Sequence, residues 1–165
     1  MNRLILDTRE LNAGAAGAVE GYGWLTATPD ATGDEIPPSA FAKAAAPLPM
    51  LLYHNLADPV GVWDEIKVDG KGLRVKGRLL IDGVARAREA YELVKERAIT
   101  ALSIGFQMGR FTAKSGGGRV IHSLNLREIS LVTVGAHPGA RISSVKQADR
   151  LLEALNRASA ALRAN

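Results

Sequence analysis

Hydrophobic and polar residues alternate over short runs along much of the chain, and a period of two residues is typical of β-strands. The clearest run spans residues 73–81, where the apolar side chains share one face: Leu73, Val75, Leu79 and Ile81. Glycine, proline and aspartate separate such runs from one another. The pattern predicts strands at residues 3–6, 19–26, 50–53, 60–67, 73–81, 102–111 and 120–134.

Three segments instead suit helices. Residues 38–46 begin with a proline, have high helix propensity and stop at another proline. Apolar residues recur at helical spacing over residues 84–98, with Asp82 as the expected N-cap. An apolar stripe over residues 148–162 predicts an amphipathic helix near the end of the chain. Between the last two predicted strands, the glycine-rich residues 114–118 predict a turn.

About seven short strands and three helices predict a mainly β protein of the α+β class, in which the strands form a closed or nearly closed barrel with flanking helices. A chain of 165 residues has the usual size of one domain and is long enough to bury a hydrophobic core. We assign residues 1–145 to the barrel domain. Residues 146–165 are expected to form the C-terminal helix, which either covers the barrel or docks onto another protein.

The residue types present exclude several kinds of site. The chain has no cysteine, which excludes a disulfide, a cysteine nucleophile and a thiolate metal site. Its three histidines lack the spacing of a helix-borne zinc site, and its glycine-rich turn lacks the lysine of a phosphate-binding loop. We therefore expect no metal and no cofactor. No apolar run approaches the ~20 residues of a membrane helix, and Asp7 comes too early for a signal peptide.

One group of residues suits nucleophilic catalysis, which needs a hydroxyl, a base and a group that orients the base. Ser103 lies in an alternating run whose apolar members face the core, so it points outward, and Gly105 leaves room there for a substrate backbone. His54 ends an apolar run beside a polar loop, and Glu128 lies on the polar face of its strand. An ordinary surface serine, a structural histidine and an exposed ion pair give the same pattern, so the pattern alone leaves both interpretations open.

Four short segments carry motifs that decide between these interpretations. They are Gly21-Tyr22-Gly23-Trp24 with Gly33-Asp34-Glu35-Ile36-Pro37, Leu52-Tyr53-His54-Asn55 with Pro59-Val60-Gly61, Leu102-Ser103-Ile104-Gly105-Phe106, and Glu128-Ile129-Ser130-Leu131-Val132-Thr133 with Ala136-His137-Pro138-Gly139-Ala140. In this order the segments resemble the prohead proteases of tailed bacteriophages, which are related in fold to the herpesvirus assembly proteases. The resemblance covers about residues 19–145, which is most of the chain.

The resemblance implies a herpesvirus-protease-like β-barrel and a catalytic triad of the Ser-His-Glu type. By the same resemblance, Ser103 is the nucleophile and His54 is the general base. Glu128 is then the residue that orients the imidazole and stabilises its charged form.

Two histidines remain alternatives for the third member of the triad. The herpesvirus relatives use a second histidine there, which directs attention to His137, and His122 would share the strand face of Glu128. The donors of the oxyanion hole are not fixed by the sequence, and the backbone N–H groups of Ile104 and Gly105 are candidates.

The resemblance also implies a function. It describes a serine endopeptidase that cleaves the scaffolding protein or scaffold segment of the major capsid protein, as well as itself, during procapsid maturation. Its expected location is the host bacterial cytoplasm, inside the procapsid, with no membrane and no specific nucleic acid as partners, and with homo-oligomerisation left open.

Two other functions remain open beside the protease. One is a non-catalytic capsid assembly factor on the same fold. The other is a basic β-barrel that binds nucleic acid, which the net charge of +4 favours. Two tryptophans, three tyrosines and three phenylalanines offer few platforms for base stacking, which disfavours nucleic-acid binding.

Overall fold

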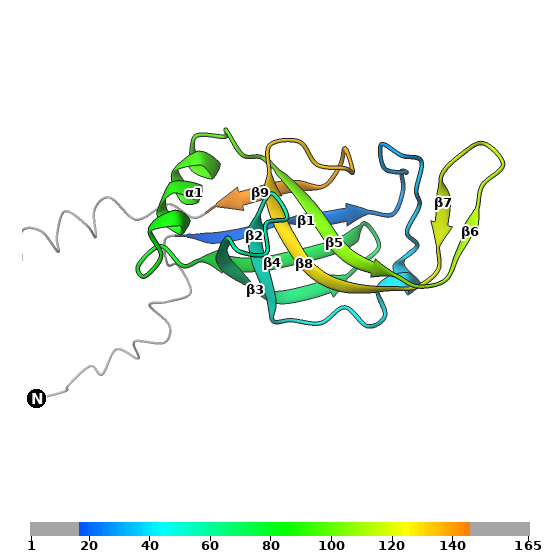
Figure 1. Cartoon of the computed structure of the whole chain (residues 1–165), viewed down its shortest axis with the longest axis horizontal. Coiled ribbons are helices and arrows are strands. Elements are labelled where there is room, and N and C mark those ends of the chain that lie inside the picture. Colours follow the sequence, from blue (N-terminus) through cyan, green and yellow to red (C-terminus); the bar gives the residue numbers. More distant parts are fainter. Residues whose placement is uncertain (1–16, 146–165) are drawn as a thin grey trace, which may run out of the picture.

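The computed structural model describes residues 17–145, and seven strands of this part close into a barrel (Figure 1). Around the barrel the order is β1, β4, β3, β2, β8, β5 and β9, and β9 pairs with β1 to complete the ring. The strands are β1 (Ala18–Leu25), β2 (Leu48–Leu52), β3 (Pro59–Val68), β4 (Gly72–Leu79), β5 (Ala101–Met108), β8 (Leu124–Val132) and β9 (Arg141–Val145). The predicted barrel of about seven strands is confirmed. The predicted strand at residues 3–6 and helix at residues 148–162 lie outside the described residues.

Strands β2 and β8 run parallel, whereas the other neighbouring strands of the barrel run antiparallel. In this parallel pair Met50 lies opposite Ile129, and Leu52 lies opposite Leu131. Because parallel strands end at the same edge of a sheet, the chain that leaves β2 passes directly beside the end of β8. The residues that follow Leu52 are therefore close to β8, although the two segments are far apart in sequence.

The inward faces of the strands form a hydrophobic core. Trp63 is fully buried, and its indole N–H donates to the carbonyl oxygen of Ile129 at 2.9 Å, so this polar group is satisfied. Met50, Leu73 and Leu102 are also completely inaccessible to solvent. Close packing of this kind makes the barrel wall a rigid support for the polar residues on its outer face.

A β-hairpin forms a separate two-stranded sheet beyond one end of the barrel (Figure 1). The predicted turn at residues 114–118 joins its two strands, which are β6 (Phe111–Ala113) and β7 (Arg119–Ile121). The prediction of continuous strands at residues 102–111 and 120–134 is wrong, because each is interrupted where the hairpin joins the barrel, at residues 109–110 and 122–123. At the interruption the N–H of Arg110 donates to the hydroxyl of Ser123 at 2.9 Å, and side-chain bonds of this kind compete with a strand ladder.

The helix predicted at residues 84–98 is α1 (Ala85–Lys95), which packs against β3 and β4. The prediction of Asp82 as its N-cap is wrong, because Val84 holds that position and no side chain caps the helix. The N–H of Val84 donates to the carbonyl oxygen of Leu80 at 2.9 Å, so Asp82 lies inside a turn that precedes the helix.

The segment predicted as a helix at residues 38–46 contains only the single 3-10 turn η2 (Pro38–Phe41). Within the turn only Ala40 and Phe41 are buried, so tertiary packing supports one turn. A segment this short does not remain helical through propensity alone, which is why the longer helix was wrong. Within residues 17–145, no helix has the length and hydrophobicity needed to cross a membrane.

Strand β9 closes the barrel but is not among the predicted strands. Its alternation is weak, since only Ile142 and Val145 are even partly buried. Ile142 pairs with Gly21 of β1, and a Cβ at that glycine would lie 2.3 Å from the carbonyl oxygen of Arg141. A glycine is therefore required where β9 meets β1.

Candidate active site

His54 lies in the turn that follows β2, where the backbone has an uncommon conformation. Tyr53 and His54 have φ angles of 51° and 60°, in the left-handed region that residues other than glycine seldom adopt. Main-chain hydrogen bonds help to hold the turn: the N–H of Tyr53 donates to the carbonyl oxygen of Leu131 at 3.2 Å, and that of Asn55 donates to the carbonyl oxygen of Leu52 at 2.9 Å. The turn places the His54 ring against the outer face of β8.

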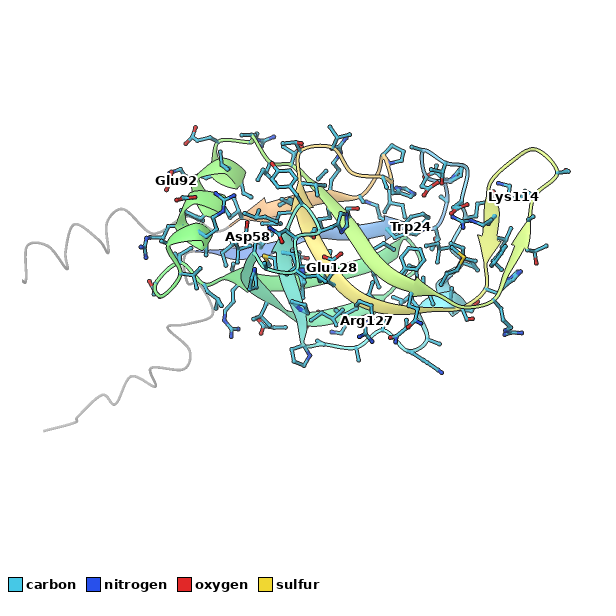
Figure 2. All side chains as sticks on the ribbon, in the orientation of Figure 1. Trp24, Asp58, Glu92, Lys114, Arg127 and Glu128 are labelled. Atoms are coloured by element: carbon cyan, nitrogen blue, oxygen red, sulfur yellow. The ribbon has the colours of Figure 1, made fainter. Side chains whose placement is uncertain are left out.

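The structure brings three predicted side chains together in one hydrogen-bonded chain on the barrel wall. His54 Nε2 lies 2.8 Å from Ser103 Oγ, and His54 Nδ1 lies 2.6 Å from Glu128 Oε1. Glu128 is labelled on β8, near the centre of the view in Figure 2. Ser103 and Glu128 are buried, whereas the His54 side chain is 44% exposed. The ring that links the two buried groups is therefore open to solvent.

The pairing of β5 with β8 explains how the serine and the carboxylate meet. Ser103 lies opposite Ser130, and Gly105 lies opposite Glu128, so the two functional side chains project from adjacent strands. As a carboxylate, Glu128 only accepts hydrogen bonds, so Nδ1 of His54 carries the proton between them. Nε2 then presents its lone pair to the Ser103 hydroxyl, which is the tautomer that a general base needs.

Gly105 has a different neighbour from the one predicted for it. We expected open space there for a substrate backbone, but the Glu128 carboxylate fills it. A Cβ at Gly105 would lie 1.9 Å from Glu128 Oε1. The glycine is therefore needed for the position of the carboxylate.

His137 is fully buried away from the His54–Glu128 pair. Its Nδ1 accepts the N–H of Gly139 at 3.0 Å, so the proton lies on Nε2, which donates to the carbonyl oxygen of Thr28 at 2.9 Å. The ring also packs on Trp24, with the ring centroids 4.5 Å apart. These contacts account for both nitrogens and hold the loop that follows β8.

His122 lies at the base of the hairpin. Its Nε2 makes a hydrogen bond of 2.8 Å with the hydroxyl of Thr112, and this contact is exposed to solvent. The structure therefore places neither alternative histidine against the ring of His54, and the group that contacts Nδ1 of that ring is Glu128.

Ser130 also belongs to this arrangement, although it is not among the site residues predicted from the sequence. Its hydroxyl donates to Glu128 Oε2 at 2.6 Å and accepts the backbone N–H of His54 at 3.0 Å. The sequence contains one signal for it: Ser130 has the same strand parity as Glu128, so both lie on the polar face of β8.

A small hollow of about 50 Å³ lies beside Ser103, on the side of β1. Its walls come from β1, β5 and the loop after β8, and they include Gly23, Trp24, Ile104, Ala136 and His137. A group bound in the hollow would therefore lie beside Ser103.

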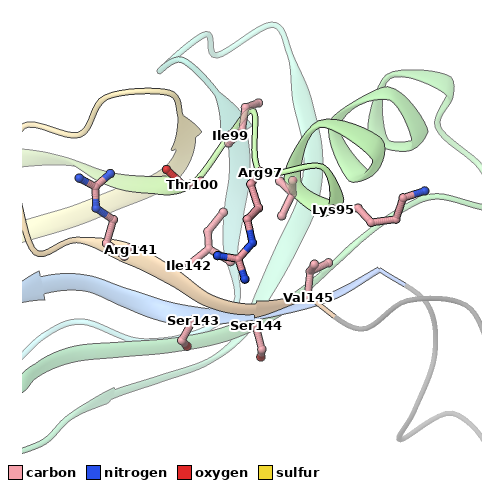
Figure 3. Close-up of a pocket in the computed structure, with 10 residues that line it drawn as sticks. Lys95, Arg97, Ile99, Thr100, Arg141, Ile142, Ser143, Ser144 and Val145 are labelled. Atoms are coloured by element: carbon pink, nitrogen blue, oxygen red, sulfur yellow. The ribbon is translucent and has the colours of Figure 1, made fainter.

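A larger cleft, of about 520 Å³, lies between α1 and β9 (Figure 3). Lys95, Arg97 and Arg141 make its lining basic. None of Ser103, His54 and Glu128 lines the cleft, so it takes no part in the arrangement described above. Among residues 17–145, no group of three or more metal-ligating side chains could hold a metal ion.

Comparison of the sequence with known proteins gives a family and two relatives. Residues 4–154 match the family described as "Caudovirus prohead serine protease". The chain is 33% identical over 144 residues to the prohead protease of Enterobacteria phage HK97, a match that covers 82% of this chain and 63% of that protein. It is 35% identical over 131 residues to the capsid polyprotein of Pseudomonas phage PAJU2, covering 76% of this chain and 20% of that protein. The chain thus spans less than two thirds of the length of these relatives.

Solved structures with a similar fold include two herpesvirus enzymes. The KSHV protease, solved in complex with a hexapeptide phosphonate inhibitor, superposes with a TM-score of 0.56 at 17% identity, over 78% of this chain and 64% of that one. The varicella-zoster virus protease gives a TM-score of 0.52 at 15% identity, over 78% and 63% of the two chains. At these identities the likeness concerns the fold, and it confirms the expected herpesvirus-protease-like barrel.

Proposed function

Because the chain belongs to the caudovirus prohead serine protease family, we propose that it is a serine endopeptidase that acts in procapsid maturation. In this proposal Ser103 is the nucleophile, His54 the general base and Glu128 the residue that orients the base. The observation that carries the proposal is the unbroken chain of hydrogen bonds, of 2.8 Å and 2.6 Å, that joins the hydroxyl, the imidazole and the carboxylate.

Acylation follows from the contacts of Ser103. Its Oγ attacks the carbonyl carbon of the scissile peptide bond while the hydroxyl proton passes to Nε2 of His54. Glu128 accepts the hydrogen bond from Nδ1–H and stabilises the imidazolium that forms. The imidazolium then gives its proton to the leaving amine, the C–N bond breaks, and an ester remains on Ser103.

Deacylation repeats these proton transfers with water as the nucleophile. His54 takes a proton from the water that attacks the ester, and then gives it to the Ser103 oxygen as the new carboxylic acid leaves and loses its own proton to solvent. Both steps pass through a tetrahedral oxyanion that backbone N–H groups must stabilise. Of the two candidates we assign this role to Ile104, which directly follows the nucleophile on β5 and whose N–H lies on the same edge of the strand as that of Leu102. The N–H of Gly105 lies on the opposite edge, toward β8.

The substrates in this proposal are the scaffolding protein or scaffold segment of the major capsid protein, and the protease itself. The names of the two relatives, a prohead protease and a capsid polyprotein, support a capsid substrate. In this proposal the substrates are cleaved inside the procapsid, in the host cytoplasm. A homo-oligomer is compatible with this function.

Co-expression of the chain with the capsid precursor of the same phage tests the proposal. We expect the native chain to shorten the precursor, and Ser103→Ala to leave it intact. Ser143→Ala is a matched control, because it removes a hydroxyl that donates to the carbonyl oxygen of Glu20 on the barrel surface. The proposal is contradicted if the native chain and Ser103→Ala process the precursor equally. It is also contradicted if the precursor assembles but neither chain cuts it, a result that favours an assembly factor.

A further inference from the structure

Ser130 lies between the strand that carries the proposed nucleophile and the strand that leads to the proposed base. It pairs with Ser103 across β5 and β8, and with Leu51 across β2 and β8. Its side chain is completely buried, so its hydroxyl must find its partners within the protein.

The Ser130 hydroxyl contacts two different parts of the site. Its O–H donates to Glu128 Oε2 at 2.6 Å, and its oxygen accepts the backbone N–H of His54 at 3.0 Å. A backbone N–H can only donate, and a hydroxyl has one proton, so the direction of both bonds is fixed. One buried group therefore holds the carboxylate and the main chain of the base at once.

This contact determines which carboxylate oxygen faces the imidazole. Ser130 occupies Oε2 of Glu128, while Oε1 remains for Nδ1 of His54. With a donor on each oxygen, the carboxylate plane cannot rotate without loss of a charge-assisted hydrogen bond. A carboxylate held by the imidazole alone would lack this restraint.

The second bond supports a strained part of the chain. The φ angle of His54, 60°, costs conformational energy for a residue with a side chain, and the surrounding contacts must compensate for it. The N–H of His54 itself bonds to the Ser130 hydroxyl, at the centre of the turn. Loss of this acceptor would release the backbone from which the imidazole projects.

We propose that Ser130 is a positioning residue for the triad, which fixes the Glu128 carboxylate and the His54 backbone relative to each other. In this way it holds the imidazole against Ser103 with the proton on Nδ1. The inference rests on the proposed function, since it assigns Ser130 a role in the activation of that same nucleophile.

Ser130→Ala tests this role, with a saturating fluorophosphonate probe in place of an unidentified peptide. The maximal labelling rate of the variant should be lower by roughly 10- to 100-fold, the loss seen when a residue that hydrogen-bonds to a metal ligand is removed. The probe concentration that gives half of the maximal rate should not change. The proton NMR signal of the short Nδ1–H bond, downfield of the amide region, should shift or disappear. Ser143→Ala, which removes a surface hydroxyl, should leave the rate and the signal unchanged.

Ser130→Cys provides a second variant if Ser130→Ala does not fold. The thiol preserves most of the side-chain volume but is a weak donor and acceptor, so the same loss of rate is expected. A native labelling rate and an unchanged downfield signal in the folded variants would overturn the inference. So would a loss confined to thermal stability or to probe affinity.

Ser103→Ala separates failure of this inference from failure of the proposed function. If Ser103→Ala abolishes labelling while Ser130 variants label normally, the triad stands and Ser130 is only a packing residue. If the probe still labels Ser103→Ala at a single other residue, the triad itself is wrong and the role of Ser130 fails with it.

Discussion

The Glu128 carboxylate occupies the space that a side chain at Gly105 would fill. The two residues face each other across β5 and β8, and a Cβ at Gly105 would lie 1.9 Å from Oε1, the oxygen that contacts His54. The absence of a side chain at Gly105 thus allows the carboxylate to lie over that residue. Gly105, two residues after the proposed nucleophile, is therefore needed for the position of the Glu128 carboxylate.

Gly105→Ala should therefore displace the carboxylate and slow the labelling of Ser103 by fluorophosphonate. A misplacement of about 1 Å costs on the order of 100-fold in rate at a preorganised site. Gly83→Ala is the matched control, since nothing lies within 4 Å of a Cβ at that position. Equal labelling rates for the two variants would show that the carboxylate does not need this space.

Glu128→Gln tests the charge of the third residue with little change of shape. The amide cannot stabilise the imidazolium as a carboxylate does, and its NH₂ group can pair with Nδ1 and reverse the tautomer of His54. Maximal labelling should fall on the order of 10⁴-fold, as for the equivalent change in other serine proteases. A rate near that of the native chain would mean that another group orients His54.

His122→Ala tests one of the two alternatives for that third residue. His122 bonds to Thr112 on the exposed hairpin, so its removal should change the labelling rate by no more than about twofold, the usual effect of a surface substitution. A loss comparable to that of Glu128→Gln would transfer the role to His122.

The two-residue period predicted the strands that build the site and the faces of Ser103 and Glu128. It could not predict their contact, because strand register and closure depend on pairings between distant segments. The resemblance of the motifs to a known family, rather than the period, selected these residues and His54 from other serines, acids and histidines.

Other features of the structure had a weak signal in the sequence or none. The left-handed turn at His54 contains no glycine that would mark it, and it depends on the parallel pairing of β2 with β8. The role of Ser130 follows from that turn. Strand β9 was missed because its residues are mostly exposed, so they show little alternation although the strand completes the barrel.

The stability of the hairpin should depend on acid pH through Asp34. Asp34 is buried, and hydrogen bonds from the Arg119 guanidinium hold the pKa of its carboxyl below its ordinary value. A lowered pKa contributes stability that is complete above the unfolded-state value and is lost as the pH falls through the folded-state value. The contribution should therefore be present at neutral pH and decline below about pH 4.

Denaturant unfolding of Asp34→Asn against the native chain measures this contribution. The native chain should be more stable at neutral pH, and the difference should shrink in acid. Asp64→Asn is the control, because it removes an ion pair with Arg78 in which both side chains are about half exposed. A difference for Asp34→Asn that does not change with pH would contradict the argument.

The site of covalent modification by a fluorophosphonate tests the central claim most directly. Mass spectrometry of the labelled chain should locate the adduct on Ser103 alone, and the adduct should be absent from Ser103→Ala and strongly reduced in His54→Ala. An adduct on a different serine, in a chain whose Ser103→Ala variant still cuts the capsid precursor, would contradict the account.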